Sequence, residues 1–444
     1  MKSGRVAVIC PTHRDRRELA RLAANRKLDF VFHEYASETL EDLVAPTPGA
    51  GSIQDPDEEV GTILAVCERA PIDAVVSTDD YPGSALAAIL AERLGLPGPP
   101  AAASLISQHK YYARLAQWEV VPEAVPAFEL MDRESDSLPA LFRDSPVFVK
   151  PCKSFFSVGA YPARTAGEWR AARQLATLPE AFFEPFDRLA RRHAGLSISA
   201  KHLLVESLIS GRQATLEGFC SGDDVYVLGV VDSLMHPGTI SFERFEYPSE
   251  LPGSVQERMQ DVSQRLMKRL GYRDGFFNIE FFYDEGSDSL AIVEVNPRMS
   301  SQFADLFEKV DGVNSYSVLL DLALGREPRL LRRAGRHRVA ASCVLRTFEN
   351  LRVVRCPSER HVVGILLRHP DARVEILATE GRMLSQELQD GRSFRYGVIN
   401  IGGRDRREII GTLEECRRLL PYEFDEAAPE SPLRAPTVED LVAE

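Results

Sequence analysis

The sequence has few of the features that mark secreted, zinc-binding or membrane-spanning chains. Its seven cysteines are scattered, odd in number and without a CxxC pair or a Cys/His ligand spacing. Reduced thiols explain this pattern better than a disulfide framework or a zinc site. No apolar stretch approaches the roughly 20 residues that a membrane helix requires, and the apolar run near the N-terminus is too short for a signal peptide. We therefore expect a cytoplasmic protein that has no membrane partner.

An excess of positive charge and a dinucleotide motif are also missing. Lys and Arg number 53 against 66 Asp and Glu, which leaves a net charge of −13. This charge disfavours nucleic acid or an anionic membrane as the main partner, although a local basic site can still bind an anionic substrate. No G-x-G-x-x-G follows the first apolar run at 6–10, so a dinucleotide site is not indicated.

The pattern that is present begins with alternating strands and helices. A chain of 444 residues is too long for one ordinary core, so we expect two or three domains. The first hundred or so residues favour a parallel sheet with helices on its faces, which gives an α/β fold class. The predicted strands cover 6–10, 29–35 and 73–77, and the predicted helices begin near 15 and cover 57–70 and 83–94.

The rest of the chain has a mixed pattern, which starts after the Pro-rich stretch 96–100. A helix that carries His109, Lys110 and Arg114 comes first, followed by alternating patterns typical of antiparallel strands. The later predictions are a helix at 254–270 that ends at Gly271, strands at 276–283 and 290–295, and a helix at 405–420 that begins with the capping-box spacing of Asp405 and Glu408.

The hairpin predicted from the strands at 276–283 and 290–295 carries the most informative polar residues. Glu294 and Asn296 are two apart on a strand, so their side chains share a face, and Glu280 comes alongside if the strands pair. Their oxygens are hard ligands that suit Mg²⁺ and leave room for phosphate oxygens. Because apolar neighbours imply buried strands, and buried carboxylates need a partner, we predict a metal site here. Arg298 places a planar cation just beyond it.

This segment resembles the ATP-grasp superfamily, whose last core strand commonly ends Glu-x-Asn-Pro-Arg. Within this superfamily, the segment 241–249 resembles a stretch of the carboxylate–amine ligase branch that includes biotin carboxylase and L-amino-acid ligase. The resemblance implies an ATP-grasp fold of two α+β subdomains around ATP, preceded by a parallel-sheet, Rossmann-like N-terminal domain. It also implies that Glu280, Glu294 and Asn296 hold Mg²⁺, with Mn²⁺ as an alternative, between ATP phosphates. Arg298 is the expected catalytic cation and substrate contact.

Other segments occur where the resemblance requires phosphate contacts. The apolar strand Pro146-Val-Phe-Val-Lys150 ends in a lysine, as does the family's phosphate-contacting strand, and Lys150 is therefore an expected catalytic and ATP-binding residue. The segment 152–160 corresponds to the loop that covers the triphosphate, although it is poorer in glycine than is usual. The remaining phosphate contacts that the resemblance implies are Lys110, Lys153, Ser154, Ser157 and Gly159.

The segment Leu203-Leu-Val-Glu206-Ser-Leu208 resembles the family's hinge, where an apolar strand contacts adenine. The resemblance implies that Glu206 accepts from the adenine amino group and that Leu208 offers main-chain atoms. Seven residues beyond this glutamate the family often has a second glutamate for the ribose hydroxyls, and this chain has Gln213. Glutamine keeps the hydrogen-bonding capacity but carries no charge.

The resemblance implies transfer of a phosphoryl group from ATP to a carboxylate, followed by coupling to an amine. Within the segment 241–249, Glu243 could recognise an ammonium group and Arg244 a carboxylate. Two alternatives stay open, namely a bicarbonate-activating component similar to biotin carboxylase and a non-catalytic ATP-binding regulator. The expected partners are small carboxylates and amines, without nucleic acid, and a second copy of the chain in a homodimer.

We divide the chain by these patterns. The expected units are an N-terminal domain at 1–100, a small ATP-grasp subdomain at 101–212, a catalytic core at 213–334, a C-terminal subdomain at 335–425 and an acidic tail at 426–444.

Overall fold

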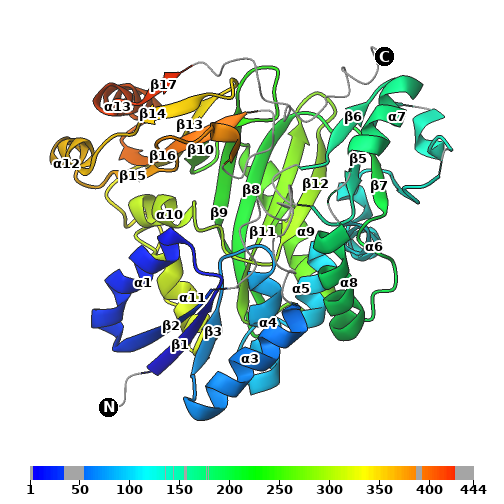
Figure 1. Cartoon of the computed structure of the whole chain (residues 1–444), viewed down its shortest axis with the longest axis horizontal. Coiled ribbons are helices and arrows are strands. Elements are labelled where there is room, and N and C mark those ends of the chain that lie inside the picture. Colours follow the sequence, from blue (N-terminus) through cyan, green and yellow to red (C-terminus); the bar gives the residue numbers. More distant parts are fainter. Residues whose placement is uncertain are drawn as a thin grey trace.

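The computed structural model describes residues 4–34, 55–135, 137–143, 145–154, 158–176, 178, 180–386 and 393–425. Two sequence predictions, the acidic tail at 426–444 and the position of Ser157, lie outside these residues. Figure 1 shows the arrangement, with the N-terminal unit at lower left, a large sheet in the centre and a small sheet at right. Among the described residues, no helix combines the length and the apolar character that crossing a bilayer requires.

The N-terminal unit is built on a parallel sheet with the strand order β2-β1-β3, as the sequence predicts. Thr12 and Asp15 form a capping box at the start of the first helix, which explains why this helix begins directly after the first strand. The elements are β1 (Gly4–Ile9), α1 (His13–Arg26), β2 (Leu28–His33), α3 (Pro56–Arg69), β3 (Ala74–Val76) and α4 (Gly83–Leu94).

Two consecutive helices and a small sheet follow. The helix predicted around His109 is in fact two helices, because His109 has an extended backbone that separates them. The small sheet has the order β4-β7-β5-β6. The elements are α5 (Ala101–Gln108), α6 (Lys110–Val120), η1 (Pro122–Ala124), β4 (Phe128–Met131), η2 (Ala140–Arg143), β5 (Val147–Pro151), β6 (Tyr161–Ala163), α7 (Ala166–Leu175), α8 (Glu180–Ala194) and β7 (Leu203–Ser207).

Helices α7 and α8 correct the expectation that this part of the chain consists mainly of antiparallel strands. Trp169 and Ala172 of α7 pack on the small sheet with Val147 and Val205. Helix α8 instead joins the core of the N-terminal unit, where Phe186 is completely buried. The segment between β6 and β7 therefore ties the small sheet to the N-terminal unit.

The large sheet has eight strands in the order β12-β11-β8-β9-β10-β13-β16-β15, and all its pairs are antiparallel. Strands that precede and follow residue 335 thus belong to one sheet. Its strands are β8 (Arg212–Ser221), β9 (Asp224–Met235), β10 (Phe242–Tyr247), β11 (Gly275–Asp284), β12 (Ser289–Asn296), β13 (Val339–Thr347), β15 (Arg373–Ile376) and β16 (Phe394–Gly403).

Helices cover both faces of this sheet. On one face α9 (Gly253–Leu270) packs on β8 and β11, and α13 (Arg406–Leu419) packs on β13 and β16. The opposite face meets α10 (Ala304–Asp311) and α11 (Ser315–Ala323), which also contact the N-terminal sheet. The remaining elements are β14 (Arg352–Arg355), α12 (Glu359–Arg368), η3 (Leu384–Gln386) and β17 (Glu423–Asp425), with β14 and β17 paired.

The two faces also differ in polarity. Along β8 and β11, Leu216 and Ile279 point into the core under α9. Because side chains alternate along a strand, their neighbours Glu217 and Glu280 point to the other face. The polar residues that the sequence singles out on these strands therefore lie on the side that faces the N-terminal unit.

Candidate active site

Two carboxylates face each other at the edge of the large sheet. Glu280 of β11 and Glu294 of β12 are directly opposed in the register. Asn296 lies on the same face, and its Nδ2 donates to Asn278 Oδ1 at 2.8 Å. Burial raises the pKa of Glu280, and the negative charge of Glu294 raises it further. The strands thus hold two like charges together, which is costly unless a cation joins them.

This donor set fits a hard divalent cation. It contains two carboxylates and one amide, and because the amide nitrogen of Asn296 is engaged with Asn278, the amide oxygen is the atom left to coordinate. No group of three or more His, Cys, Asp or Glu residues among the described residues is arranged as a metal site, so the two carboxylates need further ligands. Phosphate oxygens of a nucleotide supply ligands of that kind.

Three lysines surround the carboxylate pair. Lys110, at the start of α6, has its Nζ 3.3 Å from Glu294 Oε2 and donates to the main-chain oxygen of Ser154 at 3.2 Å. Burial opposes ionisation of Glu294, but Lys110 and Lys150 hold its pKa below the ordinary value. Helix α6 and the segment after β5 therefore bring positive charge to the same edge of the large sheet.

Lys150 is buried at the end of β5 and pairs with Glu206 of β7, with 2.6 Å between Nζ and Oε2. The second oxygen of Glu206 accepts from Arg114 Nε. Burial alone would raise the pKa of Glu206, but Arg114 and Lys150 hold it at about 2. Both oxygens of Glu206 are thus engaged within the protein, and its predicted contact with adenine stays a prediction.

Arg114 connects α6 to the large sheet. Its Nη2 donates to the main-chain oxygens of Ile292 at 2.9 Å and Val293 at 2.8 Å, next to Glu294. The guanidinium is nearly fully buried, so these contacts fix the helix that carries Lys110 against the strand that carries Glu294. The Lys-x-x-x-Arg spacing thus serves two purposes, because one residue anchors the helix and the other faces the carboxylates.

Lys153 and Arg298 approach one carboxylate from two sides. Lys153 Nζ lies 3.2 Å from Asp80 Oδ2, and Arg298 Nε lies 3.4 Å from Asp80 Oδ1. Lys153 is 2% exposed and also lies over the rings of Tyr81 and Phe186. Burial lowers the pKa of Lys153, and the pairing with Asp80 opposes that shift. The sequence predicts both cations as site residues but gives no such prediction for Asp80.

Three further predicted nucleotide contacts are Gln213, Leu208 and Gly159. Gln213 Nε2 donates to Glu280 Oε2 at 2.8 Å, so Gln213 lies beside the carboxylate pair. Leu208 follows β7 and is 37% exposed. Gly159 has a φ of 71°, a conformation that residues with a side chain rarely adopt. Of the three residues, Gln213 has a hydrogen bond to the carboxylate pair, and the roles of all three in nucleotide binding stay predictions.

Glu243 and Arg244 behave differently from the other predicted contacts. Arg244 bonds to Glu246 Oε1 at 2.7 Å and lies 3.0 Å from Glu243 Oε1. Arg244 is paired in register with Cys343, whose side chain packs beneath α13. Arg244 therefore lies on the face opposite to Glu280, within an ion-pair network. The predicted substrate contacts of Glu243 and Arg244 stay predictions.

Sequence reasoning also left Glu217 without a role. In the structure this residue is completely buried on β8, and its Oε1 accepts from the main-chain nitrogen of Ser300 at 2.8 Å. Burial raises its pKa to about 8, which the bond to Ser300 and the charge of Arg298 only partly offset. Glu217 thus holds the loop that carries Arg298. Its position two residues from Thr215 and four from Gln213 was the available signal.

Most of the residues of this site lie in a segment that matches a known domain. The sequence profile of the ATP-grasp domain matches residues 143–306, and the chain therefore carries an ATP-grasp domain. This result confirms the family resemblance and the fold class that the sequence indicates.

Three similar proteins illustrate the extent of this likeness. The L-amino acid ligase from Bacillus licheniformis has a TM-score of 0.73 at 16% identity, over 96% of this chain and 100% of that chain. Biotin carboxylase from Campylobacter jejuni gives 0.63 at 14% identity, over 99% and 94%. The carbamoyl phosphate synthase large chain of Clostridium perfringens (strain 13 / Type A) is 28% identical over 131 residues, 29% of this chain and 12% of that protein. The chain thus spans a small part of that relative.

Proposed function

We propose that this chain is an ADP-forming ligase that uses Mg-ATP to activate a small carboxylate, from an amino acid or a peptide, and couples it to an amine. The observation that carries this proposal is the in-register pair Glu280 and Glu294, with Lys110 beside it. Opposed carboxylates beside a lysine fit a metal–phosphate site. The similarity to an L-amino acid ligase and to biotin carboxylase supports the same class of reaction.

The chemistry proceeds in two steps. A carboxylate oxygen of the substrate attacks the γ-phosphorus, and the bond from this phosphorus to the bridging oxygen of ADP breaks, which leaves an acyl phosphate. The amine nitrogen then attacks the acyl carbon, the bond from carbon to the phosphate oxygen breaks, and inorganic phosphate leaves with the electron pair. The nitrogen releases its protons to solvent. Mg²⁺ would supply charge neutralisation on the phosphate oxygens when bound.

The residues of this chain bind and orient the reactants. Glu280, Glu294 and Asn296 would hold the cation, while Lys110, Lys150 and Lys153 would neutralise phosphate oxygens. Arg298 presents its guanidinium on the N-terminal side of the site, where it would orient the substrate carboxylate through two parallel hydrogen bonds. Binding both reactants in fixed positions converts an encounter between molecules into a reaction within one complex.

A bicarbonate-activating component is the second candidate, because the fold is shared with biotin carboxylase. This chain contains no Met-Lys-Met segment for biotin attachment, so a separate carrier protein would be required. A regulator that binds ATP without turnover is the third candidate. We disfavour the regulator because ATP binding alone does not need all four of the residues Glu280, Glu294, Asn296 and Arg298. Assembly as a homodimer stays a prediction.

The test is phosphate release from Mg-ATP across a matrix of amino acids, dipeptides and small carboxylates. Each pair is measured beside its single components, beside bicarbonate with biotin, and beside Glu294→Ala. Parallel series with Mn²⁺ test the alternative metal. Release that requires two partners and is lost in Glu294→Ala supports the ligase. Release that requires bicarbonate and biotin supports the carboxylase component, and ATP binding without any release supports the regulator.

A further inference from the structure

Asp80 is the anion that lies between the two cations on the N-terminal side of the site. Its two carboxylate oxygens contact different partners, Lys153 Nζ at 3.2 Å and Arg298 Nε at 3.4 Å. Asp80 is 28% exposed, whereas Lys153 is 2% exposed. The carboxylate is thus open to the site while the lysine that it neutralises is enclosed.

The main chain at Asp80 is held firmly behind this side chain. The main-chain oxygen of Asp80 accepts from Gln108 Nε2 at 2.7 Å and from the hydroxyl of Ser84. The neighbouring carboxylate, Asp79, is engaged differently, because its Oδ2 accepts from the main-chain nitrogen of Gly83 at 2.7 Å, at the start of α4. Of these two adjacent aspartates, Asp80 is the one that pairs with Lys153 and Arg298.

Asp80 joins two segments of the site that are far apart in the sequence. One of its two cations belongs to the segment after β5 and the other to the loop after β12. A single carboxylate thus holds two cations in place at the edge of the site.

We propose that Asp80 is a resident counter-anion that pairs with Lys153 and Arg298 when the site is empty, and that binds the ammonium group of the amine substrate after phosphate has taken Lys153 and the substrate carboxylate has taken Arg298. The proposal rests on the ligase function proposed above. Phosphate oxygens that reach Lys153, and the substrate carboxylate that reaches Arg298, compete directly with the Asp80 carboxylate. The released carboxylate then carries an unpaired negative charge beside the reacting carbon, where an ammonium group is the matching partner.

Two consequences follow for binding. An internal anion that competes with phosphate lowers the apparent affinity for nucleotide, because only the fraction of molecules with free cations can bind. Removing the charge of Asp80 therefore strengthens nucleotide binding. The amine has the opposite dependence, since it needs the Asp80 charge, and it therefore binds well only after the nucleotide and the carboxylate.

The experiment compares Asp80→Asn with Asp79→Asn and the wild-type chain. Calorimetric titration with a non-hydrolysable ATP analogue and Mg²⁺ measures the first consequence, and we expect roughly tenfold tighter binding by Asp80→Asn only. Unchanged or weaker binding of the ATP analogue by Asp80→Asn would overturn the proposal that Asp80 is a counter-anion. This measurement needs no substrate, so it stands even if no carboxylate–amine pair is turned over and the ligase function fails.

The second measurement uses the amine that the substrate matrix identifies and hydroxylamine, which is uncharged at neutral pH. In Asp80→Asn we expect KM for the charged amine to rise about tenfold or more, with KM for hydroxylamine unchanged. A merely structural role would change both values alike, and that result would overturn the assignment, as would a KM for the charged amine equal to that of the wild type. Asp79→Asn, which keeps the acceptor for Gly83, should leave both values unchanged.

Discussion

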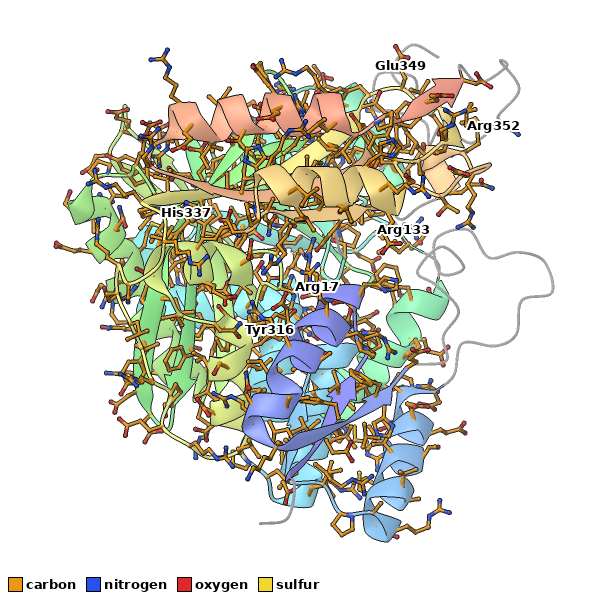
Figure 2. The ribbon with its side chains drawn as sticks, turned by 90° about the vertical axis from the view of Figure 1, so that its left-hand side faces the viewer. Arg17, Arg133, Tyr316, His337, Glu349 and Arg352 are labelled. Carbon is orange, nitrogen blue, oxygen red and sulfur yellow. The ribbon has the colours of Figure 1, made fainter. Side chains whose placement is uncertain are left out.

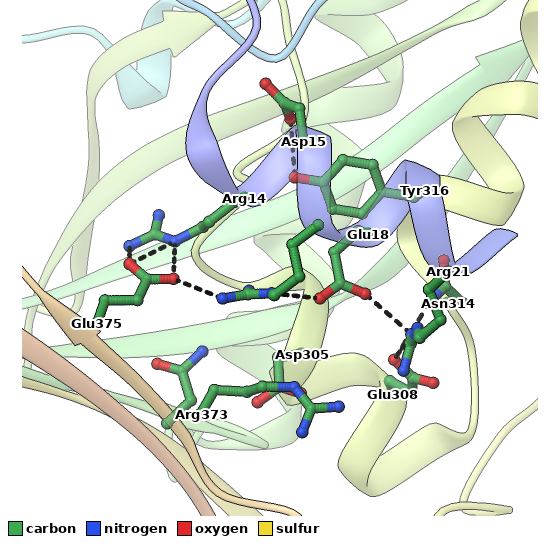
Figure 3. Close-up of polar contacts among 12 residues, drawn as sticks. Arg14, Asp15, Glu18, Arg21, Asp305, Glu308, Asn314, Tyr316, Arg373 and Glu375 are labelled. Atoms are coloured by element: carbon green, nitrogen blue, oxygen red, sulfur yellow. Dashed lines mark hydrogen bonds and ion pairs between the residues drawn. The ribbon is translucent and has the colours of Figure 1, made fainter. Parts of the chain in front are cut away.

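Two clusters of charged residues in this chain differ in how their charges are arranged. The first joins α1 to β15 and α10 on the side of the molecule seen in Figure 2, where Arg17 and Tyr316 are labelled, and Figure 3 shows it in detail. Its charges alternate in sign, and each neighbour in the series Arg14, Glu375, Arg17, Glu18, Arg21 and Glu308 forms an ion pair with the next. We call it the interface ladder. The second cluster is the proposed active site, where Glu280 faces Glu294 and three lysines lie close by.

The pKa values show the difference. In the interface ladder, the contacts with Arg14 and Arg17 overcome burial and hold the pKa of Glu375 below its ordinary value. In the active site, burial and a like charge raise the pKa of Glu280, and burial raises that of Glu217. The ladder is satisfied by the protein itself and stabilises the junction of the N-terminal unit with the C-terminal strands. In the proposed active site, the charges are not balanced by the protein alone, and bound ligands would balance them.

The largest expected effect comes from removing one charge of the opposed pair. Glu280→Gln keeps the shape and much of the hydrogen bonding but removes a metal ligand, and we expect phosphate release to fall roughly 10³-fold. Because the substitution also removes a like-charge contact, the midpoint of thermal unfolding should stay equal or rise. A loss of stability in Glu280→Gln would show that Glu280 stabilises the fold, as the interface ladder does, and would contradict the difference between the two clusters.

The next effect concerns Glu217 and changes with pH. Its pKa of about 8 in the folded chain lies above the ordinary value of 4.5, so the folded state retains a proton that the unfolded state loses, and stability falls as pH rises between these values. Glu217→Gln removes this penalty. Denaturant titrations should show little difference at pH 4 and a gain of the order of 3 kcal/mol by pH 8. An equal difference at both pH values would contradict the assignment.

Substitutions in the interface ladder should change the stability of the fold and not the binding of nucleotide. Arg14→Ala leaves the partly buried Glu375 with its weaker contact to Arg17, at 3.4 Å, and we expect a loss of about 2 kcal/mol in the free energy of unfolding. Binding of the ATP analogue should be unchanged. The matched control is Arg404→Ala, which breaks a pair with Glu408 whose arginine is 85% exposed, and which should have no measurable effect. Weakened nucleotide binding by Arg14→Ala would show that the interface ladder also contributes to nucleotide binding, and would contradict the separation of the two clusters.

The smallest effect is the pH dependence of metal binding. The pKa of Glu280 is raised to about 7 by burial and by Glu294, so below this value protons compete with Mg²⁺ for the pair. Mg²⁺ titrations in the presence of the ATP analogue should show affinity falling by up to about tenfold between pH 7 and pH 6. The pH dependence of Mg²⁺ affinity should be much weaker in Glu280→Gln. An equal pH dependence in that variant would show that the competing proton binds to a group other than Glu280.

Much of the geometry of the proposed metal site could be predicted because it depends on local patterns. Glu294 and Asn296 share a face by strand alternation alone, and the short turn between the two strands brings Glu280 opposite Glu294. The boundaries of the hairpin strands agree with the prediction to within a residue at each end. Gly271 ends α9 with a φ of 62°, as its position in the sequence predicts.

The rest depends on contacts between distant segments. Nothing near Asp80 in the sequence indicates that Lys153 and Arg298 meet it, because the three residues come from separate units of the fold. Two adjacent aspartates after a strand of a parallel sheet were a usable signal, since ligands bind at that end of the strands. Arg244 illustrates a different limit, because alternation along β10 does not tell which face of the sheet meets α13.

The continuity of the large sheet across residue 335 determines where this chain can be cut. Strands β13, β16 and β15 extend a hydrogen-bonded array that starts at β12, and β10 is the strand to which they attach. A fragment that stops at the predicted boundary after residue 334 would leave one side of β10 with unpaired main-chain groups, and such bare edges recruit other strands. For expression, labelling in segments or fusion to another protein, the core and the C-terminal strands are therefore one indivisible piece.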